Sequence, residues 1–499
     1  MKRAFLCLIG VLALAVGAVP LRAVEDVKPN IVFFLADDMG FMDIGANNPR
    51  TFYETPNIDR LASSGMRFTE GHSSCPVCSP SRASLMTGKY PPRTGVTDYI
   101  SRGRYTQGKL TAAPNQDHIA LEEVTIAERL RAGGYATFLA GKWHLGDGVF
   151  SPNAQGFGPG LLTGKAGMFY YPPSDKPAPD PKVDPHTSDR IADEAVSFIY
   201  RHRDQPFFAY LPFLDVHTPL QAPADLVAKY ERKKSAAPPD SWGQEGERKV
   251  RLVQNHAIYA AMVEQLDRAV GRVVTAIERA GLASRTIVIF TSDNGGLSTS
   301  EGHPTSNVPL RAGKGWPYEG GIRVPLIISA PGVTRPGSLC QTPVITTDFY
   351  PTLLELTSLA PAPEQHLDGV SIVPLLRGGE ILARTLFWHY PHYGNQGGAP
   401  CGFVRDGDWK LIEWYEDGRR ELYNLRDDPR EHRDLAATNP DRLSNLTARL
   451  AAWRHEVNAV MPTPNLQWDP KSQTKGPAAN YSTIISPFMT IQWPGKVQR

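Results

Sequence analysis

The sequence predicts an α/β fold with a mostly parallel central sheet, on three observations. Several short apolar runs lack alternation and end abruptly in polar residues or glycine, which is typical of strands buried on both faces. Helical patterns separate these runs, and strands that alternate with helices favour a layered fold. The composition, 41% apolar and 21% charged residues, is ordinary for a globular protein with a substantial core and excludes a mainly disordered chain.

Five apolar runs are the expected strands, and one long helix is expected between them. The strands are predicted at 31–36, 135–140, 206–214, 286–291 and 324–330. The helix is predicted at 255–279, where apolar residues recur every three or four positions and Gly281 follows as a stop signal. Segments 171–189 and 229–249 carry no apolar period, so we expect them to be surface loops.

The pattern changes after residue 383. Short alternating segments at 402–404 and 409–414, followed by a turn at 416–418, predict a small antiparallel sheet. A helix is expected at 441–457. We therefore expect a catalytic domain over 28–382, a small C-terminal subdomain over 383–462, and a tail over 463–499.

The first residues resemble an export signal. Lys2 and Arg3 precede an uncharged run, and small residues would allow cleavage after Ala18 or Ala23. This pattern predicts a secretory signal over 1–23 and a periplasmic or secreted protein. A membrane anchor is the alternative, because the run has about 18 residues, but its glycines and proline disfavour a spanning helix. After cleavage we expect no integral membrane protein.

Charge and cysteine content exclude other classes. The chain has 53 basic and 51 acidic side chains, which gives no sign of a nucleic-acid partner. Five cysteines in 499 residues are too few for a disulfide scaffold. Export would leave Cys75, Cys78, Cys340 and Cys401, some of which could pair in an oxidising compartment.

Polar residues follow four of the predicted strands. A single Asp after a strand is more often a helix cap, and a single His more often a structural residue. Four such groups in the same position predict a site, because ligands bind at the carboxyl ends of strands in open α/β sheets. The residues are Asp37, Asp38, Lys142, His144, His217, Asp293 and Asn294.

Four of these residues offer only oxygen ligands. Asp37, Asp38, Asp293 and Asn294 would suit a hard cation, Ca²⁺ or Mg²⁺. Adjacent carboxylates at 37 and 38 would repel each other without a cation, which favours the same interpretation.

A second centre lies at Ser73–Gly88. Pro80 suits the first turn of a helix, so Cys78 would lie at the helix N-terminus, where the dipole stabilises an anion. Arg82 lies one turn further on the same face. This arrangement is suited to a phosphate or sulfate group.

The same residues resemble the type I sulfatases. Residues 78–88 match the family's C-x-P-S-R-x-x-x-x-T-G motif, and Gly-Lys-Trp-His-Leu-Gly at 141–146 matches its second motif. Further blocks match in the family's order: Asp37-Asp38, His217-Thr218-Pro219, Asp293-Asn294-Gly295, Gly313–Trp316 and Glu319–Gly321. The resemblance covers about residues 28 to 460. It implies an alkaline-phosphatase-like α/β/α sandwich with a smaller C-terminal antiparallel sheet.

The resemblance also implies a mechanism. A formylglycine-generating or sulfatase-maturing enzyme would oxidise Cys78 to formylglycine, whose hydrate attacks the sulfur of a sulfate ester to give a covalent sulfoenzyme. Residue 78 would join the four oxygen ligands around the metal. Arg82 and Lys142 would balance charge, His217 and Lys314 would protonate the leaving alcohol, and His144 would take the proton whose loss expels sulfate.

Three alternatives remain open at this stage. Cys75 and Cys78 form a C-x-x-C pair that is compatible with a redox or metal role. A phosphatase or phosphodiesterase of the same fold would use Ser or Thr and usually zinc. A non-catalytic sugar-binding relative would not need the intact set of charged residues.

The substrate is expected to be a sulfated carbohydrate. The sequence resembles exported bacterial sulfatases that act on galactose or N-acetylgalactosamine sulfates. His389, His392 and Arg405 in the C-terminal segment are candidate sugar-binding residues, because imidazoles and nearby aromatic side chains suit a sugar ring. Packing of the small subdomain is an equally good explanation for them.

Overall fold

A computed structural model describes residues 28–101, 108–163, 170–171 and 185–469. The predicted signal at 1–23 and most of the predicted tail lie outside these residues. No helix among the described residues is long and apolar enough to cross a membrane.

Within the described residues, eight strands form one central sheet in the order β12-β2-β11-β10-β1-β7-β5-β6. Strands β10, β1, β7, β5 and β6 run parallel to one another. The strands of the sheet are β1 (Asn30–Ala36), β2 (Met66–Phe68), β5 (Ala136–Lys142), β6 (Leu161–Thr163), β7 (Phe207–Pro212), β10 (Thr286–Ser292), β11 (Leu326–Ser329) and β12 (Ser338–Cys340).

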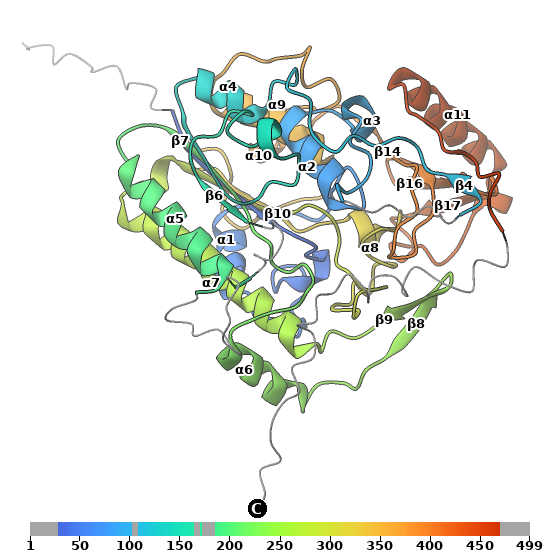
Figure 1. Cartoon of the computed structure of the whole chain (residues 1–499), viewed down its shortest axis with the longest axis horizontal. Helices are drawn as coiled ribbons and strands as arrows, with labels where there is room; N and C mark the ends of the chain where they lie inside the picture. Colours follow the sequence, from blue (N-terminus) through green and yellow to red (C-terminus); the bar gives the residue numbers. More distant parts are fainter. Residues whose placement is uncertain (1–27, 102–107, 164–169, 172–184, 470–499) are drawn as a thin grey trace, which may run out of the picture.

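Helices cover both faces of the sheet (Figure 1). The first face packs against α1 (Pro56–Ser64), α5 (Thr187–Arg201), α6 (Ala224–Lys234) and α7 (Ala257–Arg279). The second face packs against α2 (Cys78–Thr87), α4 (Ile126–Ala132), α9 (Phe349–Leu356) and α10 (Val373–Leu376). Alternate residues of β1 enter opposite cores: Val32 and Phe34 face the first, and Ile31 and Phe33 the second. The apolar runs did not alternate because both faces of each strand are buried.

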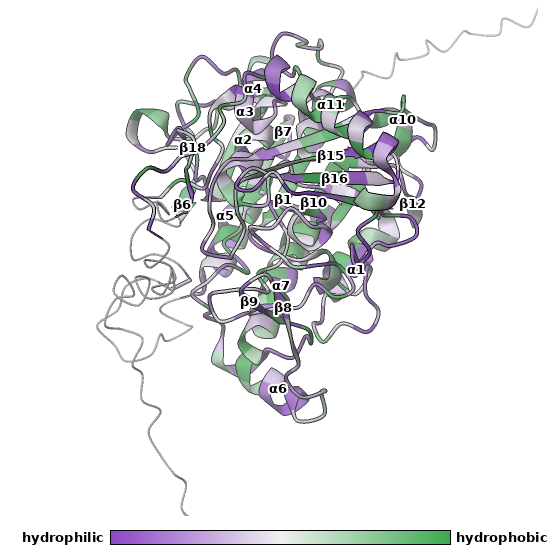
Figure 2. Ribbon diagram, turned by 90° about the vertical axis from the view of Figure 1, so that its right-hand side faces the viewer, coloured by the Kyte–Doolittle hydropathy of each residue, from purple (hydrophilic) through white to green (hydrophobic). Residues whose placement is uncertain are grey.

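A separate antiparallel sheet lies near the C-terminus, shown in orange in Figure 1. We call it the C-terminal sheet. It contains β14 (Thr385–Tyr390), β15 (Cys401–Asp406), β16 (Trp409–Trp414) and β17 (Arg420–Asn424), in that order. Helix α11 (Pro440–Glu456) packs against it through Leu446, Leu450 and Trp453. Figure 2 shows strands β1 and β10 as hydrophobic ribbons in the interior.

The remaining α-helices and strands are short. They are the helices α3 (Pro91–Thr94) and α8 (Glu319–Ile322) and the strands β3 (Gly71–His72), β4 (Leu110–Thr111), β8 (Trp242–Glu245), β9 (Arg248–Arg251), β13 (Val344–Ile345) and β18 (Thr463–Pro464).

The mixed α/β class, the mostly parallel sheet and the small C-terminal sheet are confirmed. Three details are corrected. The strand expected at 324–330 is β11, which runs antiparallel to both β10 and β2. Segment 229–249 is not one loop, because it holds the end of α6, all of β8 and the start of β9. Helix α5 begins inside the loop expected at 171–189, of which 172–184 lie outside the described residues. The domain boundaries stay a prediction.

Candidate active site

The carboxyl ends of four strands bring the predicted residues together at one edge of the sheet. Asp37 and Asp38 follow β1, Lys142 ends β5, His217 follows β7, and Asp293 and Asn294 follow β10. Helix α2 begins at Cys78 and presents Arg82 to the same place, as its spacing predicted. Lys314 arrives from the segment between β10 and α8 and contacts Asp38.

Local backbone geometry explains how two of these residues are placed. Gly141 has φ 136°, and a Cβ there would lie 1.8 Å from the Pro212 carbonyl oxygen. Only glycine therefore lets the end of β5 lie against β7 and deliver Lys142. Asp38 and His144 also have positive φ, at 64° and 58°. Non-glycine residues in this region are strained and cluster at functional sites.

Asp37 is fully buried and surrounded by cations. Lys142 Nζ lies 2.6 Å from Asp37 Oδ2, and Arg82 Nη2 lies 3.4 Å from the same oxygen. Burial alone would raise the pKa of Asp37, but the charges of Lys142, His217, Arg82 and Lys314 lower it well below its usual range. These neighbouring cations therefore favour the ionised form of Asp37.

Asp293 is paired with Arg82, but its surroundings disfavour its ionised form. Arg82 Nε and Nη2 lie 2.9 and 2.8 Å from Asp293 Oδ2. Burial and the nearby charge of Asp37 nevertheless raise the pKa of Asp293 to about 6. A cation bound among these carboxylates would stabilise the ionised form of Asp293.

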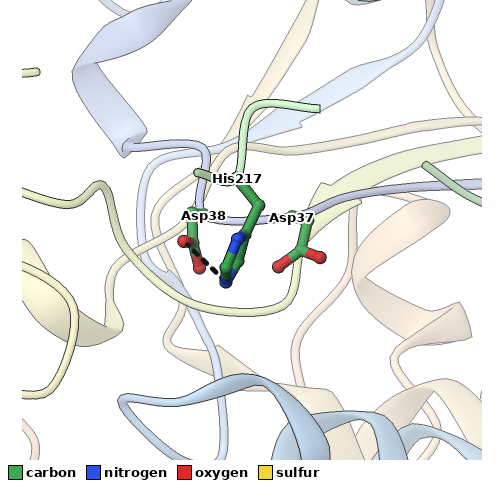
Figure 3. Close-up of side chains that lie close together, drawn as sticks. All are labelled: Asp37, Asp38 and His217. Carbon is green, nitrogen blue, oxygen red and sulfur yellow. Dashed lines mark ion pairs between the residues drawn. The ribbon is translucent and has the colours of Figure 1, made fainter. Parts of the chain in front are cut away.

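The donor atoms fit a hard cation. Asp37 Oδ1 and Asn294 Oδ1 are buried and have no hydrogen-bond donor among the described residues. An unsatisfied buried oxygen is costly, and a hard cation would give both atoms a partner. Ligand atoms of Asp37, Asp38 and His217 also lie within 4.8 Å of one another (Figure 3). The described residues thus contain an acidic site that can hold a metal ion.

His144 is oriented as a proton acceptor toward Cys78. Its Nε2 lies 2.8 Å from the Ile100 carbonyl oxygen, which requires Nε2 to carry the hydrogen. Nδ1 then presents a lone pair at 3.3 Å from Cys78 Sγ. Burial, reinforced by the charge of Lys142, holds the pKa of His144 well below its usual range, so the ring is neutral.

Cys78 itself is a poor nucleophile in its unmodified form. The side chain is buried, and burial raises the pKa of its thiol despite the nearby Lys142 and Lys314. Reactive cysteines have lowered pKa values because the thiolate is the attacking species. Burial also raises the pKa of the Cys75 thiol well above its usual value. No disulfide joins the cysteines of the described residues, which are Cys75, Cys78, Cys340 and Cys401. This geometry argues against a redox role for the C-x-x-C pair.

His217 and Lys314 flank Asp38. Lys314 Nζ lies 2.8 Å from Asp38 Oδ2. His217 Nε2 lies 3.7 Å from the same oxygen, and Figure 3 shows this pair. Burial would lower the pKa of Lys314, but the Asp38 carboxylate raises it well above its usual value. His217 Nδ1 donates to the Thr218 carbonyl oxygen at 2.5 Å. Nε2 can therefore deliver a proton only from the doubly protonated ring.

Two residues near this pair, Glu301 and Asn395, were missed by sequence reasoning. Glu301 accepts a hydrogen bond from the Thr218 hydroxyl at 2.6 Å, directly next to His217. Asn395, from the loop between β14 and β15, donates to the other Glu301 oxygen at 2.5 Å. Neither position follows a predicted strand or belongs to a recognised motif, so the sequence contains no local signal for them.

The three predicted sugar-binding residues are placed differently from the expectation. All are buried and bonded to protein groups: His389 to Tyr415 and the Val460 carbonyl, His392 to Thr97, and Arg405 to Glu70. These contacts support the alternative interpretation, in which the three residues stabilise the packing of the C-terminal subdomain. We do not include them in the substrate site.

Arg405 belongs to a buried ion-pair network between the C-terminal sheet and the main domain. Glu319 accepts from Arg323 at 2.8 Å and from Lys410 at 3.0 Å, and Arg405 binds Glu70 at 2.6 Å. Glu70, His72 and Glu319 lie close enough to hold a metal. The three cations already neutralise this cluster, so we interpret it as an internal ion network.

Lys410→Met should destabilise the protein strongly. Lys410 is fully buried and lies 3.0 and 2.8 Å from Glu319 and Glu431. Its removal leaves two buried acids without their shared cation, at a cost of about 3–5 kcal/mol. Denaturant unfolding measures this loss. Arg449→Met is the matched control, because its pair with Asp406 is exposed and should be worth less than about 1 kcal/mol. Equal losses in the two variants would contradict the proposed role of the network.

Comparison with known proteins connects this geometry to a family. The family model described as Sulfatase matches residues 29–359. The model described as N-sulphoglucosamine sulphohydrolase, C-terminal, matches residues 312–456. The first match includes all the predicted catalytic and metal-binding residues of the site, and the second includes the C-terminal sheet.

Similar proteins and structures carry related names. A "Sulfatase" of Formosa agariphila is 35% identical over 87% of this chain and 90% of that protein. The N-acetylgalactosamine-6-sulfatase of Mus musculus is 30% identical over 72% of this chain and 68% of that protein. The crystal structure of Ps i-CgsB in complex with k-i-k-neocarrahexaose has a TM-score of 0.71 and 27% identity, and covers 93% of this chain and all of that one.

These matches confirm the alkaline-phosphatase-like α/β/α sandwich with its small C-terminal sheet. They also agree with the motifs at 78–88 and 141–146, which the structure places at one edge of the sheet. The chain therefore belongs to the sulfatase family and is a sulfuric ester hydrolase.

Proposed function

We propose that the protein removes sulfate from a sulfated carbohydrate, a galactose or N-acetylgalactosamine sulfate, by means of a formylglycine made from Cys78. The observation that carries the proposal is the pairing of a buried, unreactive Cys78 with the neutral Nδ1 of His144 at 3.3 Å. A maturing enzyme would be required as a partner to oxidise Cys78. The match to an N-acetylgalactosamine-6-sulfatase supports the sugar class.

Formylglycine at position 78 would supply a hydrated aldehyde, whose hydroxyl would be the nucleophile toward the sulfur. Lys142 and Arg82 both contact Asp37, and their charges would stabilise negative charge on the sulfuryl group during transfer. His144 Nδ1 would accept a proton from the group at position 78. That proton transfer lets sulfate leave and restores the aldehyde.

The leaving oxygen would lie on the side of His217 and Lys314. Both groups contact Asp38 Oδ2, and we assign the leaving oxygen to the space next to them. The Asp38 carboxylate stabilises the protonated form of Lys314. Lys314 would therefore stabilise the leaving oxygen by its positive charge. His217, partly exposed, would donate the proton from Nε2.

A bound cation completes this proposal. Asp37, Asp38, Asp293 and Asn294, together with residue 78, would hold Ca²⁺ or Mg²⁺, with Ca²⁺ favoured by the protein-oxygen ligands. The ion would polarise a sulfate oxygen. The unsatisfied oxygens of Asp37 and Asn294 support its position.

The metal is tested by elemental analysis of the purified protein. We expect stoichiometric Ca²⁺ or Mg²⁺, loss of activity after chelation, and recovery when either ion is restored. Asn294→Ala should weaken retention of the ion, whereas Asn424→Ala, a change on the distant strand β17, should not. Stoichiometric zinc without an alkaline-earth ion would contradict the assignment and favour a phosphatase-like site.

The function is tested by two measurements. Mass spectrometry of the peptide containing position 78 should show formylglycine instead of cysteine. A panel of sulfated galactose and N-acetylgalactosamine isomers, aryl sulfates, phosphate monoesters and phosphate diesters should show sulfate release and little phosphate release. Faster turnover of a phosphate diester than of every sulfate would overturn the proposal. Export, also proposed, is tested by the N-terminal residue of the mature protein, expected near position 24.

A further inference from the structure

The leaving-group side of the site contains an acid that the mechanism does not use. Glu301 lies between β10 and α8 with φ 51°, and its side chain is partly exposed. Its Oε2 accepts from the Thr218 hydroxyl at 2.6 Å, and its Oε1 from Asn395 Nδ2 at 2.5 Å and Gln396 Nε2 at 3.4 Å. The carboxylate is therefore held by three donors from two separate segments.

Glu301 carries a negative charge close to Lys314 and His217. The charges of Lys314 and then His217 hold the pKa of Glu301 below its usual value although burial opposes them, so it is ionised. Glu301 is not one of the carboxylates that we assign to the cation, so its charge would repel a sulfate group placed next to it. The part of the substrate that suits Glu301 is therefore the neutral alcohol that leaves. Sugar hydroxyls are good donors to a carboxylate.

The segment that holds Glu301 is itself fixed. Gln396 is buried, and its carbonyl oxygen accepts from Trp316 Nε1 at 3.0 Å. A Cβ at Gly315 would meet the Gln396 side chain at 2.8 Å, so this loop packs against the backbone next to Lys314. The C-terminal part of the chain thus reaches the catalytic residues through the 391–400 loop.

We propose that Glu301 is a specificity-determining residue that accepts a hydrogen bond from a hydroxyl of the leaving sugar, with Thr218, Asn395 and Gln396 holding its carboxylate in place. A carboxylate has about four acceptor positions. Donors among the described residues use three of them, which leaves capacity for one substrate hydroxyl. This inference rests on the proposed carbohydrate sulfatase function and adds the residue that selects the alcohol.

The test compares Glu301→Gln on a sulfated sugar and an aryl sulfate. The probes are N-acetylgalactosamine 6-sulfate or galactose 6-sulfate, whichever the wild type hydrolyses faster, and 4-nitrophenyl sulfate, which lacks sugar hydroxyls. Hydrogen bonds to charged groups contribute enough to predict a loss of about 10–100-fold in kcat/KM on the sugar. Less than about threefold should be lost on the aryl sulfate.

Deoxy analogues of the sulfated sugar locate the contact. The analogue that lacks the contacted hydroxyl should be a poor substrate of the wild type and should lose nothing further in Glu301→Gln. Thr218→Val should lower sugar turnover less than Glu301→Gln, because it removes one of three donors to the carboxylate. Glu416→Gln is the matched control. Glu416 accepts from Tyr393 of the same loop but contacts neither His217 nor Thr218 in the described hydrogen-bond network.

The outcomes separate this inference from the function on which it rests. Equal losses on both probes, or no loss on the sugar, overturn the role of Glu301 while the sulfatase function stands. A wild type that hydrolyses 4-nitrophenyl sulfate but no sulfated sugar overturns the carbohydrate assignment and this inference together. Retained aryl sulfatase activity in Glu301→Gln shows that the variant has folded.

Discussion

Replacing Cys78 with alanine is expected to reduce sulfate release to background. Formylglycine cannot form at this position without the cysteine, so the site loses its nucleophile. Removal of the nucleophile from a hydrolase typically costs on the order of 10⁵–10⁶-fold in kcat. The fold should survive, because the change removes one small buried group at the start of α2. Initial rates of sulfate release and a thermal unfolding curve measure the two expectations.

Two further variants make this result specific. Cys75→Ala should retain most activity, because Cys75 is a buried, unpaired residue with a thiol pKa raised by burial. Equal inactivation by Cys75→Ala and Cys78→Ala would favour a redox pair. Cys78→Ser should at most transfer one sulfuryl group per protein molecule and then stop. A serine sulfate ester lacks the second hydroxyl from which His144 would take a proton.

Much of the fold was predictable because the strands are buried on both faces. The runs at 31–36 and 286–291 correspond to β1 and β10, and the long apolar stripe at 255–279 corresponds to α7. Strand direction was not predictable in the same way. The run at 324–330 forms β11, whose antiparallel pairing with β10 depends on the path of the chain between them, which a short apolar run does not encode.

The site was predictable to the extent that its residues follow strands or belong to motifs. Asp37, His144 and Asp293 all fall at one edge of the sheet. Glu301 and Asn395 could not be found, because they lie in loops and acquire their role only through contacts between distant segments. His389 shows the opposite error: its neighbours suited a sugar, but the residue is buried against Tyr415.

His217→Ala should separate leaving-group protonation from sulfate binding. His217 Nε2 lies 3.7 Å from Asp38 beside Lys314, and Nδ1 is committed to the Thr218 carbonyl. The loss of a general acid typically costs ~10²–10⁴-fold. That loss should appear on a sulfated sugar, because a sugar alkoxide needs a proton in order to leave. It should be far smaller on 4-nitrophenyl sulfate, because nitrophenolate leaves well without one.

Arg82→Ala provides the contrasting control for this assignment. Arg82 contacts Asp293 and Asp37 beside Cys78, where it would stabilise charge on the sulfuryl group, and that charge is common to both substrates. Its loss should therefore lower kcat/KM for both substrates by similar factors. The measurement is the ratio of kcat/KM values on the two substrates for each variant, which reports lost transition-state stabilisation. If His217→Ala also lowers kcat/KM for the two substrates by the same factor, His217 is not the general acid. It would then act on the sulfate itself or as a metal ligand, as its position near Asp37 and Asp38 allows.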